Sequence, residues 1–264
     1  MGQTAYDDVN QAIAALLGAM RGVLGPNLVG AYLYGSLANG GFTPGISDID
    51  ILAPTLGEPG ADVFEALERM HATFARQHPE WDDRIEVQYL PVEALRTFKT
   101  AVSRMAALSP GEPFHWKEAG RDWTANWYDV RENGIVLAGP PAAELIPPIA
   151  SEEFVDAVRE YASEWPGRLA RWPALRGSHA YVVLTMCRAL YTCTLGLPVS
   201  KQDGAAWATE QFPEWKGLIQ RAREWRITPA VHRQPLSNSE CDETARFAGL
   251  VLDQLGGSTD DGRT

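Results

Sequence analysis

The stretch LYGSLANGGFTPGISDIDIL, residues 33–52, decides the fold. Gly35 and Ser36 end an apolar run that is typical of a buried strand, and Asp48-Ile49-Asp50 opens a second such run. The residues between them, ANGGFTPGIS, are rich in turn formers and predict a loop. Two core strands are therefore expected to meet at a Gly-Ser turn and a pair of alternate aspartates.

The first half of the chain combines helices with strands. The patterns predict helices over 4–24, 61–78 and 121–133, and strands over 28–35, 48–54, 84–90 and 134–139. The stretch 91–120 contains three prolines and is expected to be mainly irregular.

Beyond residue 150 the pattern is helical throughout. Helices are expected near 152–165, 177–196, 203–211, 214–226 and 239–255, with 177–196 in the centre because it is apolar nearly all round. The fold class is therefore α+β. A small mixed-sheet domain, 1–150, precedes an all-helical bundle, 151–256, and a disordered tail, 257–264.

Composition excludes several classes of function. The 264 residues carry a formal net charge of −11 and no localised basic patch, so nucleic acid is not an expected partner. No apolar run is long enough to cross a bilayer, so no membrane association is expected. Three cysteines without metal-site spacing indicate reduced thiols, and we expect a cytoplasmic monomer.

Three carboxylates are candidates for a metal site. Asp48 and Asp50 are two residues apart on an expected strand, so both point to one side, and Glu86 lies on a further strand. Neighbouring carboxylates repel each other unless a cation neutralises them, and Mg²⁺ prefers hard oxygen ligands. The alternatives are a capping or turn role for each aspartate and a solvated strand face for Glu86.

The Gly-Ser turn is a candidate phosphate site. Glycine lets the backbone approach a ligand closely, and Ser36 offers a hydroxyl and an N–H group. Taken alone, such a turn is an ordinary way for a chain to leave a strand. Combined with the carboxylates, it favours displacement at a nucleotide phosphorus.

These motifs resemble a known superfamily. Gly35-Ser36, Asp48-Ile49-Asp50 and Glu86 are similar to the signature of the nucleotidyltransferases to which DNA polymerase beta belongs. RENGIVLAGPPAAELIPPI and YVVLTMCRALYTCTLGLPVSKQDGAAWA resemble the streptomycin–spectinomycin adenylyltransferases with a helical C-terminal domain. The resemblance spans roughly residues 28–226.

The resemblance implies roles for individual residues. Asp48 and Asp50 would hold Mg²⁺, and Glu86 would join them or act as general base. Gly35 and Ser36 would bind the triphosphate of ATP. In the helical half, Arg188 and Lys201 would reach the phosphates, and Trp116 would contact the acceptor. The plainer alternatives are a helix-surface stem for Arg188, a solvated helix start for Lys201 and a core position for Trp116.

The sequence departs from the family before the expected central helix. Antibiotic-modifying relatives carry acids there, whereas WPALRGSHAY has Ala174, Arg176, Ser178 and His179 and no carboxylate. Other acids available to a cationic acceptor are Glu112, Glu118, Asp122 and Asp129.

The resemblance therefore implies an enzyme that moves AMP from ATP to a hydroxyl of a small cationic acceptor, an aminoglycoside or aminocyclitol antibiotic, and so confers antibiotic resistance. Two alternatives remain open. The acceptor would be another small molecule or a protein side chain, as in antitoxin-like nucleotidyltransferases, or the chain would be a nucleotide-binding regulator without catalysis.

Overall fold

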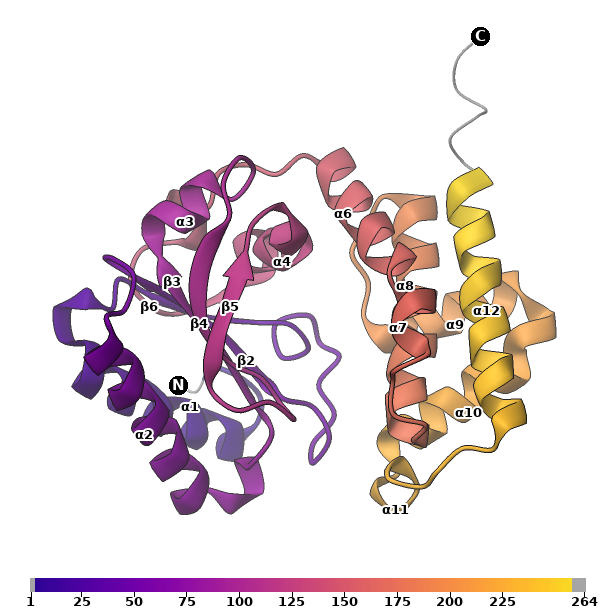
Figure 1. Cartoon of the computed structure of the whole chain (residues 1–264), viewed down its shortest axis with the longest axis horizontal. Coiled ribbons are helices and arrows are strands. Elements are labelled where there is room, and N and C mark those ends of the chain that lie inside the picture. Colours follow the sequence, from indigo (N-terminus) through magenta and orange to yellow (C-terminus); the bar gives the residue numbers. More distant parts are fainter. Residues whose placement is uncertain (1–2, 258–264) are drawn as a thin grey trace, which may run out of the picture. The chain divides into compact units, whose positions relative to one another are not determined.

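The computed structural model describes residues 3–257 (Figure 1). The chain divides between Ile149 and Ala150 into two compact units. Of the tail expected over 257–264, Gly257 ends the last helix, and the remaining residues lie outside the described part of the chain.

The first unit is built on one six-stranded sheet. Its strands are β1 (Ala31–Tyr34), β2 (Ile49–Thr55), β3 (Ile85–Pro91), β4 (Ser103–Leu108), β5 (His115–Ala119) and β6 (Ile135–Ala138). They lie in the order β5-β4-β3-β2-β1-β6. β2 and β3 are parallel, and every other neighbouring pair is antiparallel. This mixed sheet followed by a helical unit confirms the predicted α+β class.

The expectation of irregular chain over 91–120 is wrong, because β4 and β5 form an antiparallel hairpin there. The prolines lie at the boundaries of strands instead of breaking them. Pro91 ends β3, while Pro110 and Pro113 lie in the turn between β4 and β5. The strands are short, and β5 is largely polar, so neither produces a clear alternating pattern.

Helices surround the sheet of the first unit. They are α1 (Asp7–Leu24), α2 (Ala61–Gln77), α3 (Val92–Thr97), α4 (Thr124–Asn133) and α5 (Ala142–Leu145). α1 and α2 contact each other and lie together beside the sheet (Figure 1).

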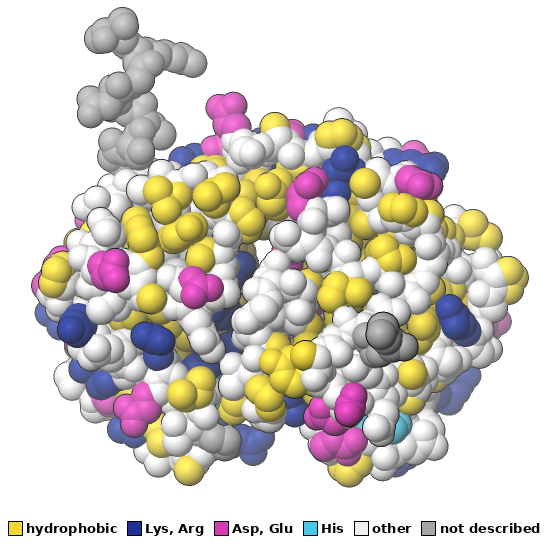
Figure 2. Space-filling model, turned by 180° about the vertical axis from the view of Figure 1, so that it is seen from behind, with side chains coloured by type: hydrophobic (Ala, Val, Ile, Leu, Met, Phe, Trp, Pro, Cys, Tyr) yellow, Lys and Arg dark blue, Asp and Glu magenta, His cyan; other side chains and the backbone are white. Residues whose placement is uncertain are grey.

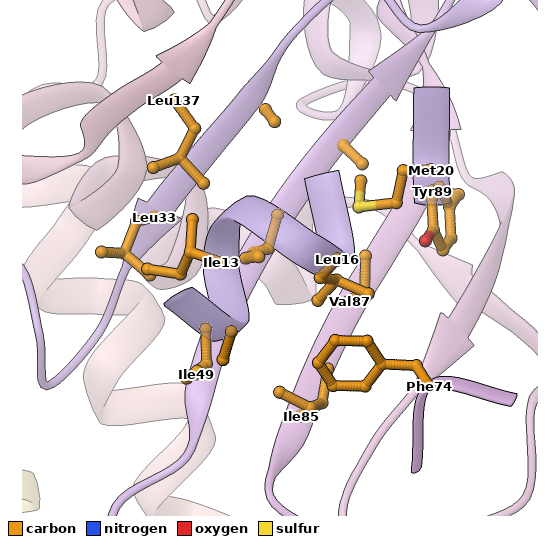
Figure 3. Packing of buried hydrophobic residues seen from close by; sticks show 14 of the residues in the cluster. Ile13, Leu16, Met20, Leu33, Ile49, Phe74, Ile85, Val87, Tyr89 and Leu137 are labelled. Carbon is orange, nitrogen blue, oxygen red and sulfur yellow. The ribbon is translucent and has the colours of Figure 1, made fainter. Parts of the chain in front are cut away.

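One face of the sheet forms the hydrophobic core with α1 and α2, and we call it the core face. It carries Leu33 of β1, Ile51 of β2 and Val87 of β3, all fully buried and in register with one another. Leu16 and Met20 of α1 pack on these strands (Figure 3). The side chains that alternate with these point to the other face.

A buried histidine belongs to this core. His71 of α2 is 4% exposed, and its Nε2 lies 2.8 Å from the Tyr89 hydroxyl oxygen. Burial lowers the pKa of His71 to about 4. In the unfolded chain a histidine titrates near pH 6.5. The unfolded state therefore binds more protons between these pH values, and stability falls as pH drops from about 6.5 towards about 4.

We expect acidification from pH 7 to pH 4.5 to cost the first unit about 2 kcal/mol of unfolding free energy through His71 alone. His71→Gln keeps a polar partner for Tyr89 but does not titrate, so this part of the pH dependence should disappear. Urea unfolding followed at both pH values measures it, with His78→Gln at a more exposed histidine as control. Equal pH dependence in wild type and His71→Gln would contradict the assignment.

The second unit contains only helices. They are α6 (Ser151–Ser163), α7 (Trp165–Leu169), α8 (Arg176–Leu195), α9 (Lys201–Gln211), α10 (Lys216–Ile227), α11 (Pro229–His232) and α12 (Asn238–Gly257). α8 contacts α6, α9, α10 and α12 and is the central helix. It ends at Leu195, and the next residue, Gly196, has a φ of 72°, the left-handed conformation that favours glycine.

Across the described residues, no helix combines the length and apolarity that crossing a bilayer requires. Acidic and basic side chains both appear on the face of the molecule shown in Figure 2.

Candidate active site

Three polar side chains lie in a row on the face of the sheet opposite the core face, which we call the site face. Tyr34 of β1 lies opposite Asp50 of β2, and Asp50 lies opposite Glu86 of β3. Residues directly opposite on neighbouring strands project from the same face. The parallel pairing of β2 with β3 therefore places Asp50 and Glu86 side by side.

Asp48 lies just before β2 instead of on a strand. The negative charge of Asp48 acts to raise the pKa of two side chains in and just before β3, Glu86 and Arg84. The Arg84 guanidinium donates a 2.6 Å hydrogen bond to the Ser47 carbonyl oxygen, which fixes it beside the aspartate.

Glu86 is half-buried and lies near the negative charge of Asp48. Burial raises its pKa, and the charge of Asp48 raises it further. Lys117 of β5 and hydrogen bonds from Tyr34 and Gln88 act in the opposite direction. A carboxylate with a raised pKa accepts a proton more readily near neutral pH, which suits a general base.

The Gly-Ser turn lies directly against Asp50. Gly35 has a φ of 68°, and a Cβ added there would lie 2.3 Å from Asp50 Oδ2. Only glycine combines the left-handed conformation with so close an approach. The two ends of the 33–52 stretch therefore form one site.

Asp129 holds the Gly-Ser turn in place. From the sequence, this residue was only a candidate contact of the cationic AMP acceptor. Asp129 of α4 accepts hydrogen bonds from the Gly35 N–H (3.0 Å) and from the side-chain amides of Asn39 (2.8 Å) and Asn133 (3.0 Å). Asp129 and Asn133 are four residues apart, one helical turn, but nothing in the local sequence connects either of them to residue 35.

The turn keeps donors available for an anion. Within the described part of the chain, the N–H groups of Ser36, Leu37 and Ala38 and the Ser36 hydroxyl have no hydrogen-bond partner. Successive backbone N–H groups in a tight turn bind phosphate oxygens well.

The donor chemistry of the site suits a hard divalent cation. Asp50 and Glu86 lie opposite each other on neighbouring strands. Burial, and after it the charge of Asp48, raise the pKa of Glu86, and a cation would offset both by stabilising the carboxylate. Among residues 3–257, however, no three His, Cys, Asp or Glu side chains are grouped closely enough to form a metal site. The metal role of Asp48, Asp50 and Glu86 therefore stays a prediction.

The structure does not bring Trp116 to the other predicted residues. Trp116 of β5 lies opposite Ala106, which lies opposite Tyr89, so its side chain is on the core face. Its ring stacks on Phe64 of α2 with centroids 4.8 Å apart. The plainer alternative for Trp116, a packing role, fits this position.

The two predicted cations of the second unit lie near one pair of tyrosines. The Tyr161 and Tyr181 hydroxyl oxygens are 3.2 Å apart. Lys201 Nζ lies 4.0 Å from the centre of the Tyr181 ring, and the charge of Arg188 acts on Tyr161. Arg188 is exposed on α8, and its phosphate role stays a prediction, as does that of Lys201.

Comparisons with known proteins match both units. Residues 23–99 match the nucleotidyltransferase domain, and residues 144–250 match the C-terminal domain of aminoglycoside adenylyltransferase. The chain belongs to the nucleotidyltransferase superfamily.

Relatives of this nucleotidyltransferase match over most of their length. An aminoglycoside (3'') (9) adenylyltransferase of Escherichia coli is 25% identical over 97% of this chain and 98% of its own. A spectinomycin 9-adenylyltransferase of Campylobacter jejuni is 28% identical over 82% and 83%. The crystal structure of spectinomycin adenyltransferase AAD(9) from Enterococcus faecialis with ATP and spectinomycin has the same fold. Its TM-score is 0.72 at 18% identity, covering 92% of this chain and 98% of that one.

Asp129→Ala should weaken ATP binding by this nucleotidyltransferase. The substitution removes the acceptor for three N–H donors, so the turn loses its anchor to α4. We expect the dissociation constant for ATP to rise about tenfold, as measured by calorimetry. Asp122→Ala is the control, because among the described residues Asp122 accepts a hydrogen bond from the Gly120 N–H and none from the Gly-Ser turn. Unchanged ATP affinity in Asp129→Ala would contradict the anchoring role.

Proposed function

We propose that this nucleotidyltransferase moves AMP from ATP to a hydroxyl of a small cationic acceptor, an aminoglycoside or aminocyclitol antibiotic, and releases pyrophosphate. The observation that carries the proposal is the row on the site face. Glu86 lies beside Asp50, and Asp50 lies against the Gly-Ser turn. A proton acceptor, hard oxygen ligands and a phosphate-binding turn are thus within one small region. The names of the relatives add the class of acceptor.

The turn supplies the phosphate contacts. The N–H groups of Ser36 and Leu37 and the Ser36 hydroxyl donate to phosphate oxygens, while Asp129 keeps the turn in place through the Gly35 N–H. This arrangement orients the triphosphate without using a charged side chain of the first unit. The phosphate role of Arg188 and Lys201 stays a prediction from the resemblance.

Glu86 carries the proton step. The acceptor hydroxyl gives its proton to the Glu86 carboxylate as its oxygen attacks the α-phosphorus in line. The bond between the α-phosphorus and the bridging oxygen breaks, and pyrophosphate leaves with the electron pair. Asp48 and Asp50, with Glu86, would hold Mg²⁺, which offsets negative charge on the phosphates when bound.

Incubation with ATP, Mg²⁺ and a panel of acceptors tests the proposal. The panel should include streptomycin, spectinomycin and uncharged sugars. Mass spectrometry should show a gain of one AMP on an aminoglycoside or aminocyclitol and none on the sugars. If the protein binds ATP yet modifies no member of the antibiotic panel, the acceptor class is wrong.

A second acceptor class has one observation in its favour. The segment from Ala174 to His179, which includes the first turn of α8, has no carboxylate, and its polar groups bond within the second unit. Arg176 Nη1 donates to Gln234 Oε1 at 2.6 Å, and His179 is 3% exposed. A cation-gripping role for this segment is therefore not favoured, and the alternative acceptor is another small molecule or a protein side chain. An AMP adduct on a protein in the same assay, with none on the antibiotics, would select that alternative.

The remaining expectations belong to this proposal. We place the reaction in the cytoplasm, where ATP is supplied, with a monomer as the active form and no nucleic acid as partner. Light scattering of the active enzyme tests the oligomeric state.

A further inference from the structure

A chain of hydrogen bonds connects β1 to the carboxylate of Glu86. Gln88 Nε2 lies 2.6 Å from Glu86 Oε1, and the Tyr34 hydroxyl lies 2.9 Å from Gln88 Oε1. The Tyr34 hydroxyl is 3.5 Å from Glu86 Oε1, at the limit of hydrogen bonding. Gln88 has no exposed surface, and Tyr34 is 4% exposed.

The chemistry of the three side chains determines which group donates and which accepts in this series of hydrogen bonds. An ionised carboxylate only accepts hydrogen bonds, so the Gln88 amide must present its NH₂ group to Glu86. Its carbonyl oxygen then faces Tyr34 and accepts the single hydroxyl proton at the shorter of the two distances. The reversed amide would set an oxygen against the Glu86 oxygen and leave the NH₂ group towards the tyrosine.

The sheet holds all three groups rigidly. Glu86 and Gln88 are two residues apart on β3 and therefore project from the same face. Tyr34 reaches that face from β1, two strands away, because its register partner Asp50 is also the register partner of Glu86. A constellation on paired strands moves less than one on loops.

These hydrogen bonds involve one oxygen of the Glu86 carboxylate and not the other. Gln88 Nε2 donates to Glu86 Oε1, the oxygen that the Tyr34 hydroxyl also faces, and over the described residues Oε2 accepts no hydrogen bond. A glutamate held by one oxygen has few rotamers left, and its second oxygen is available to accept a proton from a substrate hydroxyl.

We propose that Gln88 and Tyr34 are positioning residues that hold Glu86 by Oε1 and direct Oε2 to the acceptor hydroxyl. The inference rests on the proposed function, because it assigns Glu86 the proton step. Neither residue touches substrate in this scheme, so their loss should lower kcat and leave nucleotide binding intact.

Gln88→Met tests the contact to Glu86 at nearly constant volume. We expect kcat for AMP transfer to fall about 10- to 100-fold, with the KM for ATP within about twofold of wild type. Tyr34→Phe removes only the hydroxyl and should lower kcat about tenfold, because the Gln88 amide is then free to turn over. The double variant should be no slower than Gln88→Met alone, since both residues act through one contact.

Leu52→Val is the matched control. Leu52 is fully buried on β2 directly opposite Gln88, shares its face, and carries no polar atom. It should lose some thermal stability and keep kcat within about twofold. If Gln88→Met and Tyr34→Phe lose only stability, as this control does, with kcat unchanged, the positioning role is wrong.

Crystal structures of wild type and Gln88→Met give a readout independent of turnover. The Glu86 carboxylate should occupy one position in wild type and a different or split position in the variant. A Glu86 carboxylate that stays in place without Gln88 overturns the inference. A wild type that transfers no AMP to any acceptor overturns the proposed function instead, and the two crystal structures then still decide whether Gln88 positions Glu86.

Discussion

Glu86→Gln should abolish AMP transfer almost completely while leaving ATP bound. The substitution keeps the shape of the side chain and removes the proton acceptor that the site face presents beside Asp50. A positioned general base contributes about 10²- to 10⁴-fold to the rate, so kcat should fall within this range. ATP affinity, measured by calorimetry without acceptor, should stay within about threefold, because the phosphate donors belong to the turn.

The control for this loss is Glu93→Gln, which makes the same change on an exposed side chain of α3. It should keep the wild-type kcat. The mass-spectrometric transfer assay serves both variants. An active Glu86→Gln enzyme would remove Glu86 from the proton step, and another group would have to take its place.

Gly35→Ala should produce the second large effect, through two separate causes. Alanine at a φ of 68° is strained by about 1–2 kcal/mol. In addition, its Cβ would lie 2.3 Å from Asp50 Oδ2, so either the turn or the aspartate must move. We expect kcat/KM for ATP to fall at least about 100-fold, because the phosphate contacts and the carboxylates lose their common geometry.

Gly111→Ala separates the two causes. Gly111 has a φ of 79° in the β4–β5 turn, and nothing lies within 4 Å of an added Cβ. Its variant should show the strain as reduced thermal stability with unchanged kcat/KM. If both variants lose stability equally and both remain active, close contact between the turn and Asp50 is not needed for catalysis.

Much of the fold was predictable because apolar periodicity is strong in the long helices and in β1, β2 and β3. α8 was predicted within one residue at each end, since its apolar residues continue to a Gly-x-Pro stop at Gly196. β4 and β5 were not predicted. Their sequences, SRMAAL and HWKEA, are short and show no clear alternation of apolar and polar residues. Pairing with each other and with β3 stabilises these strands, and this pairing cannot be read from the local sequence.

The site was predictable to the extent that its residues lie close together in the sequence. Gly35, Asp48 and Asp50 share one stretch, and Glu86 follows from alternation on its own strand. Asp129 and Gln88 could not be assigned roles, because their partners lie on other elements and the contacts exist only after the sheet and α4 have packed. For Trp116, the position in the sequence did not indicate which face of its strand the side chain occupies, and its contact with the acceptor stays a prediction.

The parallel pairing of β2 with β3 also has a kinetic meaning. Parallel neighbours cannot be joined by a tight turn, so the chain from Leu56 to Arg84, including α2, must cross over before Asp50 meets Glu86. The β1–β2 and β4–β5 pairs are antiparallel between consecutive strands and need far less loop closure. A partly folded chain can therefore have β1 paired with β2 while the carboxylates of Asp50 and Glu86 remain apart. Recovery of catalysis during refolding would require the closing of that crossover, which is a less local step than the pairing of β1 with β2 or of β4 with β5.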